Sequence, residues 1–362
     1  MACVDGEWLL TPGPVAVHPE ALKAMARQVV SHRSQAFREL LASVREKLAR
    51  VYGGGEVLVL TGSGTLAVDS MAWSLVEPGE RVLVVSHGEF GGRLAESLRR
   101  RGAVVETLEP PEPGAAVDAG EVAARLEQGG YAAVAMVYTE TSLGLSYRDA
   151  ETVAKAAREA GALVLVDAVS ALAGERVPPP PLVDAVASAS QKALAAPPGL
   201  SFVAVSEAAL EKMAGLRSPP PPYLDLAKAA GFHRDRGETP FTPAVNLLYA
   251  LDRALDLILE VGVEAWVERH ERRARLLYEQ LPRLGLEPVA VEPRYRANTV
   301  AAFYTPVPSS RLAAALARRC IRVARGMGEL REKVVRISTM GWLGDEVYEQ
   351  LPAAIEEALR GA

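Results

Sequence analysis

The feature that most constrains the fold is a repeated alternation of apolar runs and helical patterns between residues 56 and 170. Short apolar runs typical of buried strands cover residues 56–62, 81–86, 131–139 and 162–170. Stretches with helical spacing separate them, at 65–76, 91–102 and 148–161. Strands that alternate with helices form a mostly parallel sheet with helices on its faces. We therefore predict an α/β fold.

The length of the chain predicts two domains, because 362 residues exceed what one hydrophobic core usually holds. Helical patterns cover residues 21–51 and, at greater length, 242–284, and shorter strand and helix patterns follow the second one. We place an N-terminal segment at residues 1–20, a large domain at 21–260 and a smaller C-terminal α+β domain at 261–362.

Composition argues against several classes of function. The net charge is −5 and no basic block is interleaved with aromatic residues, which argues against nucleic acid as the main partner. No apolar stretch is long enough to span a membrane, and the start lacks a signal-peptide pattern, so we expect a cytoplasmic protein. The two cysteines, Cys3 and Cys320, are too few for a disulfide framework or a cysteine metal site, and we expect no metal.

Lysine is rare in this sequence, and one lysine stands apart. Of the 40 basic residues only seven are lysine, at positions 23, 47, 155, 192, 212, 228 and 333. Six of them lie in charged, helix-like or loop-like sequence, where a solvated side chain is expected. Lys192 instead follows the small, largely apolar run 184–190, which has the pattern of a buried strand, so its ammonium group emerges at the strand end. A charge placed there is either paired or used in chemistry.

A glycine-rich turn at residues 61–65 joins the first strand to the next helix. Exposed backbone amides at a helix N-terminus favour a phosphate. The segment 62–67 also matches the G-x-G-x-x-A fingerprint of dinucleotide sites, with Glu89 as a candidate ribose ligand. That interpretation leaves Lys192 without a role, and likewise Asp167, which ends the apolar run 161–167. Asp167 taken alone is equally consistent with a helix cap or a turn.

An acid at one strand end, a lysine at a later strand end and a phosphate-binding turn together suit pyridoxal phosphate. Its aldehyde needs an amine, its pyridine nitrogen needs a carboxylate and its phosphate needs backbone amides. With these residues in place, the sequence resembles a class V, fold-type I pyridoxal-phosphate aminotransferase of the alanine–glyoxylate and serine–pyruvate group. The resemblance covers nearly the whole chain, in the motifs LLTPGP (9–14), GSGTLAVDSM (62–71), GEFGGR (88–93), ETSLG (140–144), LVDAVSALAG (165–174), SQKALAAPPGLS (190–201) and VVRISTMG (334–341).

The resemblance implies a role for individual residues. Lys192 bonds to the cofactor aldehyde, and Asp167 holds the pyridinium. Phe90 stacks on the ring, where relatives often have Trp, and Thr141 reaches the phenolic oxygen. Arg336 binds the substrate α-carboxylate through its two-pronged guanidinium group. Phosphate contacts are implied from Ser63, Gly64, Thr65, Gln191 and, across a homodimer interface, Thr242.

The activity implied by the resemblance is transfer of an amino group from alanine or serine to glyoxylate or pyruvate. The reaction would be ping-pong, with Lys192 moving the α-proton. Three alternatives stay open. A cysteine desulfurase would need Cys320 as nucleophile, whereas its position between helix-like and strand-like sequence favours a buried, inert thiol. A nicotinamide-dependent dehydrogenase would use the fingerprint at Gly62, and a non-catalytic binding protein would leave no need for Lys192.

The sequence departs from the pattern of the family in three places. Tyr138 stands where relatives often have His, and it would reshape the substrate side of the pocket. Thr239 falls where some relatives have a cross-subunit Tyr. The segment 32–34 adds His32 and Arg33, which belong either to the substrate site or to an ordinary helix terminus.

Overall fold

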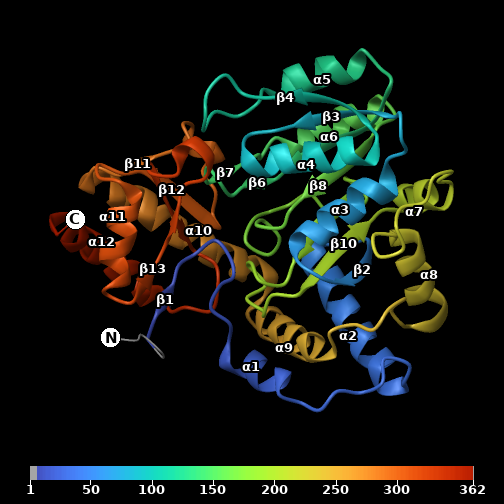
Figure 1. The fold of residues 1–362 in the computed structure, drawn as a ribbon, viewed down its shortest axis with the longest axis horizontal. Helices are drawn as coiled ribbons and strands as arrows, with labels where there is room; N and C mark the ends of the chain where they lie inside the picture. The colour runs from blue at the N-terminus through green and yellow to red at the C-terminus, as the bar shows by residue number, and fades with distance from the viewer. Residues whose placement is uncertain (1–5, 362) are drawn as a thin grey trace.

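The chain is built around a seven-stranded sheet (Figure 1), and the computed structural model describes residues 6–361. The strand order is β2-β10-β9-β8-β5-β3-β4. Pairings from β9 through β8, β5 and β3 to β4 are parallel, whereas β10 is antiparallel to both of its neighbours. The predicted mostly parallel α/β sheet is therefore confirmed. The strands are β2 (Glu56–Thr61), β3 (Arg81–Val85), β4 (Val104–Leu108), β5 (Tyr131–Val137), β8 (Leu163–Asp167), β9 (Ala185–Ala189) and β10 (Leu200–Val205).

Helices cover both faces of this sheet, and successive strand residues enter opposite cores, as the pleat requires. Val164 and Val166 of β8 belong to one core, whereas Leu165 between them belongs to the other. The Leu165 face packs against α3 (Gly64–Leu75), α4 (Glu89–Arg101), α7 (Glu207–Ala214) and α8 (Leu226–Arg236). The opposite face packs against α2 (Gln35–Tyr52), α5 (Ala119–Glu127), α6 (Ala150–Glu159) and α9 (Val245–Val261).

A smaller domain with its own sheet lies beside the large one, in orange and red in Figure 1. Its four strands have the order β11-β12-β15-β14, and its core includes Phe303 and Ile337. The boundary at residues 260/261 stays our proposal. The strands are β11 (Glu287–Pro288), β12 (Val300–Tyr304), β14 (Ala324–Arg325) and β15 (Val334–Ser338). The helices are α10 (Val263–Gln280), α11 (Ser309–Ala317) and α12 (Asp345–Arg360), with short 3-10 turns η1 (Leu281–Leu284), η2 (Pro293–Tyr295) and η3 (Gly328–Leu330).

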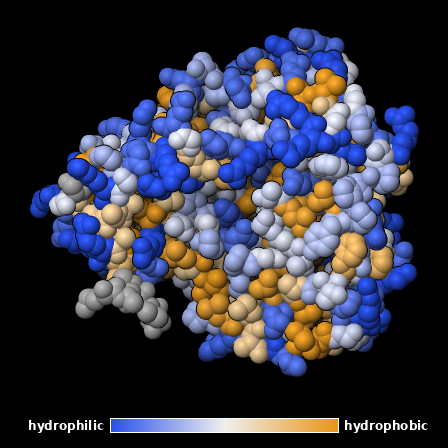
Figure 2. Space-filling view, viewed as in Figure 1, coloured by the Kyte–Doolittle hydropathy of each residue, from blue (hydrophilic) through white to orange (hydrophobic). Residues whose placement is uncertain are grey.

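Two short segments link the domains. β1 (Trp8–Leu9) pairs in parallel with β13 (Ile321–Arg322) of the small domain, and the chain then crosses to α1 (Pro19–Met25) beneath the large one (Figure 1). The hairpin of β6 (Thr139–Glu140) and β7 (Leu145–Ser146) leaves the large sheet and contacts β12. In the space-filling view of the same face, hydrophobic residues gather in the lower half, around α1 and α9 (Figure 2).

Both long helical patterns are interrupted in the structure. Residues 21–51 form α1 and α2 instead of one helix, because Ser34 caps the start of α2 by accepting a hydrogen bond from the backbone N–H of Phe37 at 3.4 Å. Residues 242–284 form α9, α10 and η1, and the break falls at Gly262, whose φ of 94° lies outside the helical region. Among residues 6–361, no helix has the length and apolar character needed to cross a membrane.

Because the central strands are buried and the edge strand is not, we expect two valines of the same sheet to contribute differently to the free energy of unfolding. Val166 in β8 is fully buried, whereas Val104 on the edge strand β4 is 57% exposed. We expect Val166→Ala to lower the free energy of unfolding by roughly 2 kcal/mol, because it leaves a small cavity in the core. Val104→Ala should change it by less than about 0.5 kcal/mol. Urea unfolding of both variants measures the difference, and equal effects would contradict the assigned layers.

Candidate active site

A cavity of about 1100 Å³ opens at the carboxyl edge of the large sheet. β2 runs in the same direction as β9, because β10 is antiparallel to both. The ends of these strands therefore share the edge where α/β proteins bind ligands. The wall contains residues that follow or end four strands: Ser63, Gly64, Thr65, Ser86, His87, Asp167, Gln191 and Lys192. The small domain completes the wall with Met327, Glu329 and Leu330.

Lys192 lies in the turn after β9 and is in contact with the N-terminal LLTPGP motif. Its Nζ donates a hydrogen bond to the carbonyl oxygen of Pro12. Gly13, with a φ of 129°, approaches so closely that a Cβ there would lie 2.8 Å from Nζ. The pKa of Lys192 is lowered to about 8, mainly by burial. The charge of Asp167 opposes this shift, whereas the charge of Arg336 adds to it. Lys192 therefore titrates close to neutral pH, as a proton carrier requires.

Asp167 ends β8, the strand next to β9, and is 7% exposed. Its Oδ1 accepts a hydrogen bond from the backbone N–H of Val169 at 2.9 Å, so the turn contact that the sequence allowed is present. Burial raises the pKa of Asp167 to about 6, and the charge of Glu140 raises it further, whereas the Val169 bond and Lys192 lower it. A carboxylate and an amine thus lie at adjacent strand ends of one cavity.

The turn before α3 has three features of an anion site. Ser63 is the N-cap of α3 but makes no side-chain capping bond. A Cβ at Gly64 would lie 2.7 Å from Cγ1 of Val169, so only glycine lets the backbone pass here. The buried Oε1 of Gln191 has no hydrogen-bond partner among residues 6–361. Because a flipped amide presents Nε2–H instead, Gln191 fits a phosphate bound to the free amides of α3.

Glu140 was not among the predicted residues, yet it organises the wall that carries Phe90. The backbone N–H groups of Phe90 and Gly91 donate to its Oε2 at 3.2 and 3.1 Å, and that of Ser142 donates to its Oε1 at 3.1 Å. Burial raises the pKa of the fully buried Glu140. The available signal was the glutamate of the ETSLG motif, a charge directly after the apolar strand pattern 131–139. Phe90 lines the cavity, as Thr141 does.

Arg336 on β15 lies on the small-domain side of the site. Its Nε donates to the carbonyl oxygen of Arg325 at 2.8 Å, and its Nη1 donates to that of Thr141 at 3.3 Å. Within the described part of the chain it makes no ion pair, and it is not among the residues that line the cavity. Its charge nevertheless lowers the pKa of Lys192. The hydroxyl of Thr141 donates to Oγ of Ser170 at 2.7 Å.

Several predicted positions lie outside this cavity. Thr239 and Thr242 line a separate small depression with Tyr223 and Phe241, whose rings stack at 5.3 Å. Arg33 donates to Oε2 of Glu238 at 2.7 Å and to the carbonyl oxygen of Thr239 at 2.8 Å, so it anchors that loop. His32, beside it, does not line the cavity.

Tyr138, the position where relatives often have His, also lies away from the cavity. Its hydroxyl donates to the carbonyl oxygen of Arg176 at 2.9 Å, and burial raises its pKa. It is absent from the cavity wall, so a direct effect on the pocket is not seen.

The structure corrects two further expectations. Cys320 lies between α11 and β13, outside the cavity, and is partly exposed. It is disulfide-bonded, so the expectation of a buried, inert thiol is wrong. Glu89 does line the cavity, but β2 and β3 are separated in the sheet by β10, β9, β8 and β5. A dinucleotide site needs the glycine turn and the ribose acid on neighbouring strands. The dinucleotide interpretation is therefore wrong.

The sheet topology, with Asp167 and Lys192 at adjacent strand ends, is that of a fold-type I transferase, and comparison with known proteins gives the family. The class V aminotransferase family matches residues 18–339, and the chain belongs to that family. It is 36% identical to an uncharacterized aminotransferase of Methanocaldococcus jannaschii, over 97% of this chain and 92% of that protein. The protein is thus an aminotransferase, which moves an amino group between an amino acid and a keto acid.

Two solved structures are similar over nearly their full lengths. An aspartate aminotransferase of subgroup IV from Thermus thermophilus is 39% identical, with a TM-score of 0.90 and coverage of 98% of this chain and 99% of that one. An alanine–glyoxylate aminotransferase from Nostoc sp. is 34% identical, with a TM-score of 0.92 and coverage of 99% and 97%.

The raised pKa of Asp167 predicts a specific pH dependence of stability. Between about pH 4 and pH 6 the folded chain binds more protons at Asp167 than the unfolded chain, so the free energy of unfolding falls as the pH rises through this window. Asp167→Asn removes this pH dependence. Between about pH 4 and pH 6 the free energy of unfolding of the variant should therefore rise relative to that of the wild type by up to roughly 3 kcal/mol. Thermal unfolding of the cofactor-free proteins from pH 4 to pH 7.5 measures this. Asp235→Asn, at an exposed position of α8, is the control, and parallel profiles for wild type and Asp167→Asn would contradict the prediction.

Proposed function

We propose that this protein uses pyridoxal phosphate to transfer an amino group from alanine or serine to glyoxylate or pyruvate. The observation that carries the proposal is the placement of Asp167 and Lys192 at adjacent strand ends beside the uncapped start of α3. The similarity to an alanine–glyoxylate aminotransferase from Nostoc sp. supports the choice of substrates.

The residues present fit the cofactor. The amides of Gly64 and Thr65 with Gln191 would hold the phosphate, and the orphaned amide of Gln191 gains a partner there. Asp167 would pair with the ring nitrogen, and Nζ of Lys192 would bond to the aldehyde carbon. Burial raises the pKa of Asp167 in the free protein, and a cationic ring nitrogen would supply the buried carboxylate with a counter-charge. Phe90 on α4 and Thr141 in the hairpin would contact the ring face and the phenolic oxygen.

When bound, pyridoxal phosphate supplies an electron sink and an aldehyde that takes up and returns the amino group. Lys192 moves the proton from the substrate α-carbon, for which its pKa of about 8 suits it. Arg336, which has no acidic partner within 4 Å among residues 6–361, binds the α-carboxylate. The amino acid and the keto acid would use the same arginine in turn, which is consistent with a ping-pong reaction.

A homodimer would complete the phosphate site. Thr242 lies outside the cavity of its own subunit, beside the exposed aromatic rings of Tyr223 and Phe241, which are 48% and 38% exposed. Exposed aromatic residues of this kind suit a protein contact. We therefore keep the proposal that Thr242 reaches the phosphate of the partner subunit.

A dicarboxylic donor is a second candidate. Arg93 on α4 lines the cavity, with its guanidinium carbon 4.8 Å from the ring centre of Phe90, and within residues 6–361 it makes no ion pair. A free guanidinium group at this position would suit the second carboxylate of aspartate. The similarity to an aspartate aminotransferase from Thermus thermophilus points the same way.

The role of Lys192 is tested by Lys192→Ala. We expect this change to lower the rate of pyruvate formation from alanine and glyoxylate by at least about 10⁴-fold, because no other lysine reaches the aldehyde or moves the proton. Lys212→Ala, which removes a partly buried ion pair with Glu80 away from the cavity, is the control and should retain turnover. A Lys192→Ala variant within tenfold of wild type would contradict the assignment. The same assay with aspartate as donor decides between the two candidate substrate classes.

The role of Arg336 is tested by Arg336→Ala. We expect KM for the amino acid and for the keto acid to rise together, roughly 10- to 100-fold, because both present a carboxylate and lose the same charged hydrogen bonds. The affinity for pyridoxal phosphate should stay unchanged. Arg325→Ala, whose side chain pairs with Glu332, is the matched control. Unchanged KM values in Arg336→Ala would move the carboxylate site elsewhere.

A further inference from the structure

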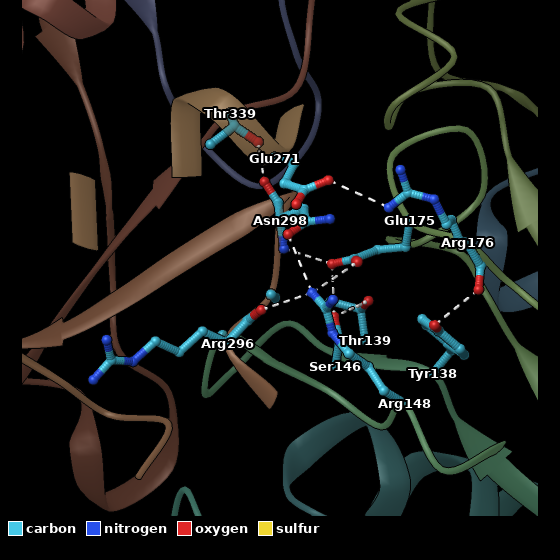
Figure 3. Close-up of polar contacts among 12 residues, drawn as sticks. Tyr138, Thr139, Ser146, Arg148, Glu175, Arg176, Glu271, Arg296, Asn298 and Thr339 are labelled. Atoms are coloured by element: carbon cyan, nitrogen blue, oxygen red, sulfur yellow. Dashed lines mark hydrogen bonds and ion pairs between the residues drawn. The ribbon is translucent and has the colours of Figure 1, made fainter. Parts of the chain in front are cut away.

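A buried carboxylate, Glu175, lies where the β6–β7 hairpin of the large domain meets the small domain (Figure 3). Its side chain is 1% exposed. Oε1 accepts a hydrogen bond from Oγ of Ser146 at 2.7 Å and another from the backbone N–H of Asn298. The first donor belongs to the hairpin and the second to the segment just before β12, so a single carboxylate oxygen joins the two domains.

Arg148 strengthens this junction from the large-domain side. Its Nη2 lies 3.3 Å from Oε2 of Glu175 and donates to Oδ1 of Asn298 at 3.1 Å and to the carbonyl oxygen of Arg296 at 3.0 Å. Burial raises the pKa of Glu175, and the charge of Arg148 opposes that rise. A buried charge with a half-exposed partner is an expensive way to stabilise a fold, since apolar residues of equal size often do as well. Its benefit is a fixed geometry.

The two ends of the junction lead to residues of the proposed site. On the large-domain side, Ser146 shares a hydrogen bond of 2.9 Å with Thr139, two residues before Thr141 in the same hairpin. On the small-domain side, the hydroxyl of Thr339 donates to the carbonyl oxygen of Asn298, and Thr339 directly follows β15, which carries Arg336.

The backbone of the hairpin is docked just as closely. A Cβ at Gly144 would lie 2.7 Å from the backbone nitrogen of Ala302 in β12, and the N–H of Ala297 donates to the Gly144 carbonyl oxygen at 2.9 Å. Two backbones in contact leave the hairpin little freedom to slide along β12.

We propose that Glu175 is a positioning residue that fixes Arg336 relative to the hairpin, and hence relative to Lys192 and Asp167. This inference rests on the proposed function of Arg336 as the carboxylate-binding group. Glu175 is placed to touch neither substrate nor cofactor, because its side chain is 1% exposed and both of its oxygens already have partners in Ser146, Asn298 and Arg148. Its effect on the substrate carboxylate therefore passes through Arg336, whereas the cofactor contacts from Gly64, Gln191 and Lys192 come from segments outside this junction.

The test is a double-mutant cycle with Glu175→Gln and Arg336→Ala, measured in the full-length protein with pyridoxal phosphate, alanine and glyoxylate. The glutamine keeps the volume and the acceptor oxygen but loses the charge that holds Arg148. We expect Glu175→Gln alone to raise both KM values about 3- to 30-fold with kcat and cofactor affinity within about twofold of wild type. In the Arg336→Ala background the same change should have no further effect on KM.

A second readout does not depend on activity. Hydrogen exchange of the cofactor-free protein should become faster in residues 139–146 and 334–339 of Glu175→Gln, while α3 exchanges as in wild type. Arg148→Met, a change at a half-exposed position, should give the same pattern of exchange. This variant tests the same junction independently, should Glu175→Gln fail to fold. Glu271→Gln, which removes a solvent-exposed pair with Arg176 near the junction, is the control and should change neither readout.

The possible failures can be told apart. An equal rise of KM in the wild-type and Arg336→Ala backgrounds, or unchanged exchange in both segments, would overturn the role of Glu175. If the wild type itself transaminates neither alanine nor aspartate, the proposed substrates are wrong. The exchange experiment then decides the role of Glu175 alone, because faster exchange confined to the two segments still supports it.

Discussion

Burial of an amine and a carboxylate at neighbouring ends of an apolar sheet governs the chemistry of this site. Lys192 and Asp167 each lose hydration there, which lowers the pKa of the amine to about 8 and raises that of the acid to about 6. Their mutual attraction only partly offsets this effect. Such sites are costly to maintain and are where reactive groups are usually found. In the proposed function, the aldehyde and the ring nitrogen of pyridoxal phosphate would supply the partners that these two groups lack.

The sheet and the two domains turn this local constraint into a site. β8 and β9 are adjacent and parallel, so residues 25 positions apart in sequence meet at one edge. The N-terminal motif then closes over Lys192 through Pro12 and Gly13, although it is far away in sequence. The small domain contributes Arg336, whose Nη1 donates to the carbonyl oxygen of Thr141, and Glu175 holds the same hairpin through Ser146. The β6–β7 hairpin therefore contributes both to the cavity, through Thr141, and to the contact between the domains, through Ser146.

Much of this could be predicted from the sequence, because each strand ends in a residue that its apolar run makes conspicuous. Lys192, Asp167 and the turn at Gly64 follow from that pattern. The antiparallel direction of β10 could not be predicted, because hydrophobic spacing does not report strand direction. The helix breaks at Gly262 and before Ser34 were also missed, because a hydrophobic pattern continues across a single glycine or cap residue. Glu140 and Glu175 were missed for a different reason. Their partners are backbone N–H groups and residues from distant segments, which only the folded chain brings together.

Of the seven lysines, Lys192 alone lines the cavity, and we propose that it bonds to the cofactor aldehyde. The most direct measurement is borohydride reduction of the full-length protein loaded with pyridoxal phosphate, followed by peptide mapping. Reduction makes the bond permanent, and the seven lysines of the chain are the internal controls. We expect one modified peptide, containing Lys192, and loss of that modification in Lys192→Ala. Modification of any other lysine in place of Lys192 would contradict it.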